Sequence, residues 1–115
     1  MTENNVAYHK SDMERPDLST KYKEPLNQLQ KGIISIFEEL LGYRNLGIED
    51  NFFELGGNSL KAMFVVNRIN KDFQCKLNII DFYKNTSASK LSVKINTSQL
   101  HTENLNLLDR EEIII

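Results

Sequence analysis

Apolar side chains recur at helical spacing in two segments of this 115-residue chain, one after Pro25 and one after Ser59. Intervals of three and four residues place them on one face of an α-helix. The first series stops at Gly42, a residue type common just beyond a helix end. Two amphipathic helices that pack on each other predict an all-α fold. The two series are Leu26, Leu29, Ile33, Ile36, Phe37, Leu40 and Leu41, then Ala62, Val65, Val66, Ile69 and Phe73.

Two further helices are expected nearer the C-terminus. Residues 78–83 suit one short helix, with Asn78 as its N-cap, and either Thr86 or Ser87 could cap a last helix. No alternating apolar run is long enough for a sheet. The glycines between residues 43 and 58 indicate a long loop, which the apolar Phe52 and Phe53 would anchor to the core. The expected fold is a small four-helix bundle with a long structured loop between its first and second helices.

The chain divides into three parts by composition. Residues 1–24 are polar and lack periodic apolar positions, so we expect a flexible N-terminal linker. Residues 25–96 form the predicted domain. Residues 97–115 mix leucines, a charged run and a terminal Ile-Ile-Ile. This tail is expected to be either a linker remnant or a short helix that docks on its own domain or on a neighbour.

Composition excludes several classes of function. The net charge is −2 with both signs mixed along the chain, which argues against nucleic-acid binding. No apolar run approaches the roughly 20 residues that span a bilayer, and no secretory signal begins the chain, so a soluble cytoplasmic protein is expected. Cys75 is the single cysteine, and His9 and His101 are the only histidines. No internal disulfide and no metal site are therefore predicted.

Ser59 follows two glycines and is the candidate reactive residue. A hydrolase nucleophile elbow needs G-x-S-x-G after a strand, and here the second glycine and the strand are both missing. A Ser-His pair would require a histidine from the linker or tail. The lysine and the spacing of a nucleotide-binding phosphate loop are absent as well. Hydrolysis and nucleotide binding are therefore not expected.

Two interpretations of Ser59 remain open on its position alone. At a helix N-terminus, backbone N–H groups and the helix dipole favour an attached or approaching phosphate. A serine in this place also commonly does no more than cap the helix. Position does not decide between them.

The surrounding motif is longer than a helix cap requires. The run DNFFELGGNSL at residues 50–60 resembles the core motif of peptidyl carrier (thiolation) domains of nonribosomal peptide synthetases, which belong to the phosphopantetheine-binding, acyl-carrier-like family. The resemblance extends to ELLG at 39–42, IE at 48–49, DFY at 81–83 and Leu91. It covers about residues 25–95 and implies the acyl-carrier-like helical fold.

The resemblance implies a role for Ser59. In that family a phosphopantetheinyl transferase attaches a phosphopantetheine arm from coenzyme A to the serine hydroxyl, and the thiol of the arm holds an amino acid or peptide as a thioester. The carrier itself is not an enzyme. Its implied partners are an adenylating domain and condensation, tailoring or thioesterase domains, which together make antibiotics and other secondary metabolites.

Two residues depart from the family pattern. Asn58 stands where the family usually has histidine or aspartate, and Thr86 is not preceded by the usual proline. Fatty-acid carriers resemble one another in an acidic second helix, whereas residues 59–73 are net positive here. A peptidyl carrier is therefore expected, with an acyl carrier of polyketide or fatty-acid assembly, or an unmodified interaction module, as the alternatives.

A face without charge is predicted beside the serine. When the residues from Ser59 to Phe73 are projected on a helix, a third sector lies between the side that faces the core and the side that carries the charges. Apolar groups next to a functional residue indicate a docking surface, and methionine suits changing partners. The alternative is that the last helix or the loop covers part of it. The sector holds Ser59, Leu60, Met63, Phe64, Asn67 and Asn70, and the expected partner-recognition residues are Gly57, Asn58, Leu60, Met63 and Phe64.

Overall fold

The computed structural model of the protein describes residues 13–97. The tail predicted at 97–115 and residues 1–12 of the predicted linker lie outside the described residues, except for residue 97. The elements are β1 (Met13–Glu14), α2 (Gln28–Leu41), β2 (Tyr43–Arg44), α3 (Ser59–Phe73), α4 (Ile79–Lys84) and a last helix over residues 88–97. The predicted all-α fold is confirmed, with one pair of two-residue strands added to it. No helix in residues 13–97 has the length and apolar character needed to cross a membrane.

The first helix begins two residues later than its apolar pattern suggested. Asn27 is its N-cap, because the Asn27 side chain accepts a hydrogen bond from the Gln30 N–H at 2.8 Å. Leu26, the first member of the predicted apolar series, lies before this cap and is 76% exposed. Gly42 ends the helix in the left-handed conformation, at φ 84°, as its position predicted.

The later helices begin where capping residues predicted. Asn78 and Asp81 form a capping box that starts α4. Ser87, rather than Thr86, caps the last helix, since its hydroxyl accepts from the Lys90 N–H at 3.3 Å. Three main helices and one short helix were expected, and all four are present.

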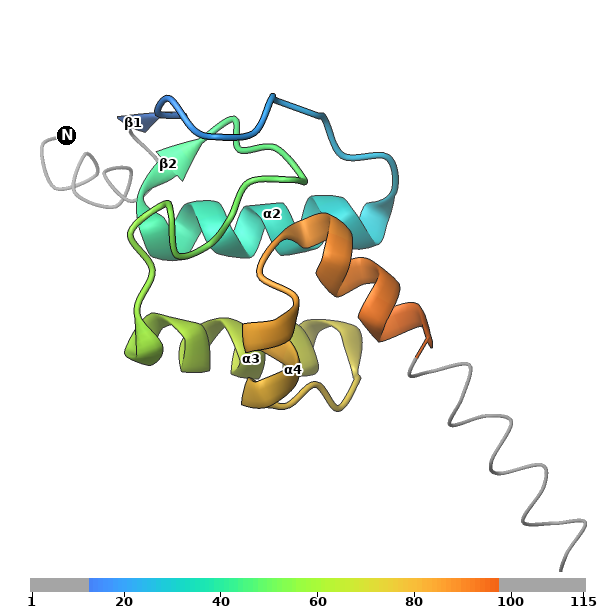
Figure 1. Cartoon of the computed structure of the whole chain (residues 1–115). Helices are drawn as coiled ribbons and strands as arrows, with labels where there is room; N and C mark the ends of the chain where they lie inside the picture. The colour runs from blue at the N-terminus through green and yellow to red at the C-terminus, as the bar shows by residue number, and fades with distance from the viewer. Residues whose placement is uncertain (1–12, 98–115) are drawn as a thin grey trace, which may run out of the picture.

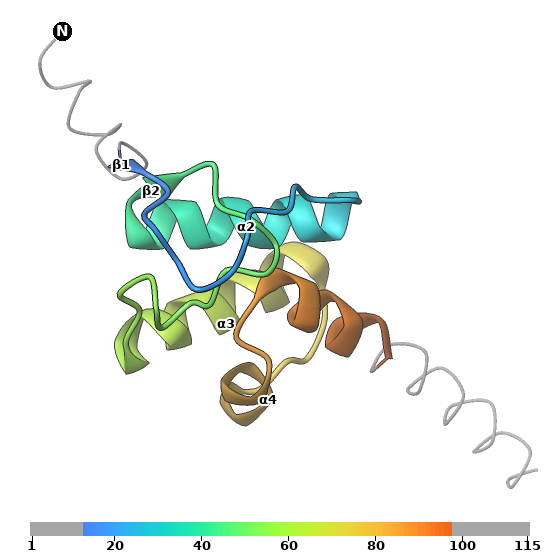
Figure 2. The same ribbon diagram turned by 45° about the horizontal axis from the view of Figure 1, so that its top comes forward.

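Helices α2 and α3 form the centre of the domain. Figure 1 shows them side by side and running in opposite directions, and Figure 2 shows the same arrangement after rotation. The last helix contacts α2, where the Gln30 amide donates to the Ser92 hydroxyl at 3.4 Å. The buried core draws on α2, the loop, α3, α4 and the last helix. Its largest apolar members are Phe37, Phe52, Phe82, Ile33, Leu46, Ile69 and Leu91.

Residues 13–24 lie against the domain, which differs from the flexible linker expected there. Strand β1 pairs in parallel with β2, with Met13 opposite Tyr43. Further along, the Lys23 carbonyl accepts from the Ile48 N–H at 2.9 Å. In Figure 1 this blue segment runs above α2 and beside the green loop. The contacts of residues 13–24 are mostly polar or made by the backbone, so the apolar periodicity of the sequence could not predict them.

Candidate functional site

The loop before Ser59 is held by hydrogen bonds from one asparagine. The Asn51 side-chain oxygen accepts from the N–H groups of Phe53 and Glu54, at 2.8 and 3.1 Å, and its amide donates to Thr86 at 2.6 Å. The adjacent Phe52 is fully buried and its ring lies 5.2 Å from that of Phe37. The loop is therefore an ordered support for the serine, as the two phenylalanines predicted.

Asp50, at the start of the motif, is a buried charge with four hydrogen bonds. Its carboxylate accepts from Arg15 at 2.7 and 2.8 Å, from the Gly47 N–H at 2.7 Å and from Thr20 at 3.1 Å. Burial alone would raise the pKa of Asp50, but the hydrogen bonds from Arg15, Gly47 and Thr20 outweigh burial and hold the pKa below its usual value. Asp50 thus stays ionised and connects the N-terminal segment to the loop.

The cap of α3 is Asn58, and Ser59 is the first residue of the helix itself. The Asn58 side chain accepts from the Lys61 N–H at 2.9 Å. Because Asn58 supplies this cap, the Ser59 hydroxyl is not needed for it, and Ser59 is exposed. The interpretation of Ser59 as a mere helix cap is therefore wrong, and the hydroxyl is accessible at a helix N-terminus that favours phosphate.

Tyr83 is the neighbour of Ser59 that sequence reasoning missed. Its hydroxyl donates to Ser59 Oγ at 2.9 Å, across 24 residues of sequence. The ring of Phe53 stacks on that of Tyr83, with centroids 5.4 Å apart and planes 9° from parallel. The sequence marked Tyr83 only as part of a family-like triplet, and no local pattern indicates which way the short α4 helix faces.

The apolar residues predicted for partner recognition are exposed. Leu60, Met63 and Phe64 have 62%, 55% and 50% of their surface accessible. The alternative, that the loop or the last helix covers Leu60 and Phe64, is not what residues 13–97 show. The placement of Asn70 in the uncharged docking sector is corrected. Its side chain bonds to both the N–H and the carbonyl of Leu77 and so holds the connection to α4.

The other two predicted recognition residues have structural roles. Asn58 is exposed and caps α3, so its side-chain oxygen is engaged. Gly57 packs against Phe52 so closely that a Cβ at this position would overlap the phenylalanine ring. Both residues fix where α3 begins, and hence where the Ser59 hydroxyl lies.

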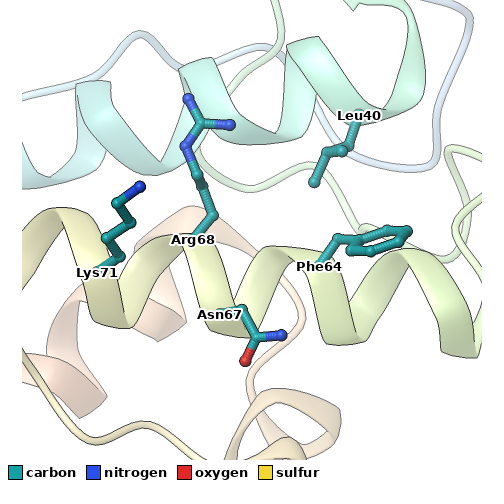
Figure 3. Close-up of a pocket in the computed structure, with 5 residues that line it drawn as sticks. All are labelled: Leu40, Phe64, Asn67, Arg68 and Lys71. Carbon is teal, nitrogen blue, oxygen red and sulfur yellow. The ribbon is translucent and has the colours of Figure 1, made fainter.

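A pocket of about 280 Å³ lies beside Phe64, between α2 and α3. Figure 3 shows Phe64 near Leu40 at one end and the side chains of Arg68 and Lys71 at the other, with Asn67 below. Arg68 pairs with Glu39 of α2 at 3.1 Å and with Asp72 at 3.3 Å. The pocket extends the exposed apolar face towards positive charge.

Sequence comparison identifies the family. The model for "Phosphopantetheine attachment site" matches residues 31–95, more than half of the chain. The chain is 38% identical over 103 residues to bacitracin synthase 1 of Bacillus licheniformis, and 46% identical over 61 residues to gramicidin S synthase 2 of Brevibacillus brevis. These matches cover 86% and 53% of this chain, but only 2% and 1% of those synthases.

A solved structure agrees with the sequence relatives. The chain is similar to the structure of the phosphopantetheine transferase Sfp in complex with coenzyme A and a peptidyl carrier protein, with a TM-score of 0.64 and 32% identity. The match covers 66% of this chain and 99% of that one. Ser59, exposed at the start of α3, stands within the matched region of the family model. The chain therefore belongs to the phosphopantetheine-attachment family, as a peptidyl carrier domain.

Proposed function

We propose that Ser59 bears the phosphopantetheine arm of this carrier domain, and that the arm presents amino-acid or peptide thioesters in nonribosomal peptide biosynthesis. One observation carries the assignment. The Ser59 hydroxyl is exposed at the first residue of α3 while Asn58 does the capping. Ser59 is thus accessible to a transferase, and its hydroxyl is not used to cap the helix.

The attachment reaction needs no catalytic group from the carrier. Ser59 Oγ forms a bond to the phosphorus that carries the pantetheine, and the pyrophosphate bond of coenzyme A breaks. Adenosine 3′,5′-bisphosphate leaves, and the serine proton passes to a base of the transferase. The N-terminal end of α3 favours the resulting phosphodiester anion. The proposed role needs only an accessible hydroxyl on a rigid support.

Catalysis belongs to the partners under this proposal. An adenylating domain loads the thiol, and condensation, tailoring or thioesterase domains use the thioester. The carrier raises the effective concentration of its cargo at each active site, since a tethered substrate meets the enzyme as an intramolecular reactant. We place the domain in the cytoplasm, where the transferase has access to coenzyme A.

Leu60, Met63 and Phe64 are the proposed docking residues. All three are exposed apolar side chains that follow the serine on α3. Gly57 and Asn58 contribute by fixing the start of that helix. A partner that reaches the serine therefore meets an apolar surface next to it.

Intact-protein mass spectrometry tests the attachment site. The protein is incubated with coenzyme A and a promiscuous phosphopantetheinyl transferase, next to Ser59→Ala and Ser35→Ala, the latter removing another exposed serine, on α2. Wild type and Ser35→Ala should gain one phosphopantetheine mass and Ser59→Ala none. An equal gain in Ser59→Ala would refute the assignment, and no gain in any variant would favour an unmodified interaction module.

Cargo is tested on the modified protein. Purified adenylating domains with amino acids, and acyltransferases with malonyl-coenzyme A, are compared for thioester formation on the arm. Amino-acid loading is expected. Loading by the acyltransferase alone would instead identify an acyl carrier of polyketide or fatty-acid assembly.

A further inference from the structure

Tyr83 places a hydrogen-bond donor beside the attachment serine. It lies in the last turn of α4, and its hydroxyl donates to Ser59 Oγ at 2.9 Å. The phenol is the more acidic of the two hydroxyls and hence the better donor, and with the tyrosine donating, the proton of Ser59 is free to leave when Oγ reacts. The contact is thus compatible with attachment of the arm.

The Tyr83 ring is fixed before any arm is attached. The Phe53 ring stacks on one face of the Tyr83 ring, with ring centroids 5.4 Å apart. The Phe53 ring also packs against the ring of the buried Phe82, with centroids 6.1 Å apart. The capping box of Asn78 and Asp81 fixes the start of α4. With 44% of its surface exposed, Tyr83 still reaches solvent at the site. The donor is therefore preorganised beside Ser59 while remaining accessible to a larger group.

Attachment of the arm changes what Tyr83 can bind. Esterification turns Oγ into an ester oxygen, which is a weaker acceptor than a hydroxyl. It also adds a phosphorus atom with two non-bridging oxygens that share a negative charge. These oxygens are two bonds from Oγ, so a donor that already contacts Oγ can reach one of them. Hydrogen bonds to a charged acceptor are shorter and about twice as strong as neutral ones.

We propose that Tyr83 anchors the arm by donating a hydrogen bond to a phosphodiester oxygen in the modified protein, a proposal that rests on Ser59 as the attachment site. The hydrogen bond to Ser59 in the unmodified protein is exchanged for a stronger one. The first atoms of the arm are then held beside α4. Attachment and folding become coupled through this hydroxyl, and the coupling acts equally in both directions.

The experiment is a double-mutant cycle between modification and Tyr83. Wild type and Tyr83→Phe are each prepared with and without the arm, and urea unfolding gives four equilibrium constants. Tyr22→Phe is the matched control, because Tyr22 is 49% exposed and contacts Arg15 in the N-terminal segment. Modification should lower the equilibrium constant for unfolding in both proteins. The fold-decrease in wild type should be roughly three to ten times the fold-decrease in Tyr83→Phe. Tyr22→Phe should behave as wild type.

A second measurement follows NMR resonances, first in the wild-type protein and then in the two variants. With 13C-labelled tyrosine, the Cζ resonance of Tyr83 should shift on modification more than that of Tyr22, and this holds even where Tyr83→Phe folds poorly. The 31P resonance of the arm should move in Tyr83→Phe but not in Tyr22→Phe.

The outcomes separate this proposal from the attachment site. A mass gain on Ser59, together with equal modification effects in wild type and Tyr83→Phe and an unmoved Tyr83 Cζ resonance, would overturn the Tyr83 role and leave Ser59 in place. Absence of the mass gain, or a gain that persists in Ser59→Ala, would overturn both.

Discussion

Arg15 and Asp50 are 35 residues apart in sequence, and the Arg15 guanidinium binds both carboxylate oxygens of Asp50 at 2.7 and 2.8 Å. The Asp50 side chain is fully buried and that of Arg15 is 18% exposed. This bidentate pair joins the N-terminal segment to the loop that presents Ser59. Residues 13–24, upstream of α2, therefore pack as part of the carrier fold.

Loss of this pair should destabilise the domain. Arg15→Met leaves the buried Asp50 carboxylate without its arginine partner, and we expect a loss of about 3 kcal/mol in the free energy of unfolding. Arg44→Met is the control, because the Arg44–Glu14 pair is 50% and 63% exposed and should cost less than about 1 kcal/mol. Urea denaturation measures both. Equal losses would contradict a special role for the buried pair.

Acid should weaken the fold through Asp50. Its pKa is lower in the folded protein than in the unfolded chain, so the folded state binds this proton less readily. The stabilisation is complete above the unfolded value and is lost as the pH falls below about 4, through the folded pKa. Urea unfolding at several pH values should show this decline, and Asp50→Asn should flatten it. A decline of the same steepness in Asp50→Asn would assign the acid sensitivity to other carboxylates.

Gly57→Ala should be destabilising because of a steric overlap. The added Cβ would meet the ring of Phe52, which is fully buried and cannot move aside freely. We expect a loss of about 1–3 kcal/mol in thermal or urea unfolding. Gly56→Ala tests strain without overlap, since nothing lies within 4 Å of a Cβ there although its φ is +96°. Wild-type stability of Gly57→Ala would show that the loop can shift.

Asn58 allows capping and partner recognition to be separated. Asn58→Asp keeps a side-chain acceptor for the Lys61 N–H and should preserve stability, whereas Asn58→Ala should lose about 1 kcal/mol. If partner proteins also contact the Asn58 side chain, Asn58→Asp will change the rate of modification or loading while the stability stays unchanged. Modification and loading of Asn58→Asp at wild-type rates would show that Asn58 only caps α3 and is not a recognition residue.

Met63→Glu should impair partner docking and leave the fold intact. Met63 is 55% exposed on α3, so a charged side chain there costs little stability, but it disrupts an apolar interface. Steady-state loading by an adenylating partner should fall roughly tenfold. Met13→Glu is the control, because Met13 is similarly exposed, at 53%, but lies on β1. Unchanged rates of Met63→Glu with every partner would contradict the docking surface.

Local patterns predicted most of the helical framework. The bounds of α3 followed from the glycines before Ser59 and from the apolar stripe that ends at Phe73, because a long amphipathic helix is specified by its own residues. Asn78 likewise predicted the start of α4 as an N-cap. Leu26 was misassigned because a helical pattern continues past a cap that only the side chain of Asn27 defines.

Long-range polar contacts could not be predicted in the same way. Arg15 and Tyr83 each contact a residue of the 50–60 motif from far along the chain, and neither belongs to a periodic pattern. Asn70 falls on the uncharged face of a projected helix, but the chain turns back at Leu77 and occupies its amide. In each case the tertiary path of the chain, which no local signal encodes, decides what the side chain does.

The parallel pairing of β1 with β2 limits the reach of the carrier. The twelve residues 13–24 lie along the domain, so they remove up to about 40 Å of free span from any upstream connection. Figure 1 places β1 and the start of α3 at the same end of the domain. A domain joined ahead of residue 13 is therefore held closer to the carrier core than it would be if residues 13–24 were a free linker.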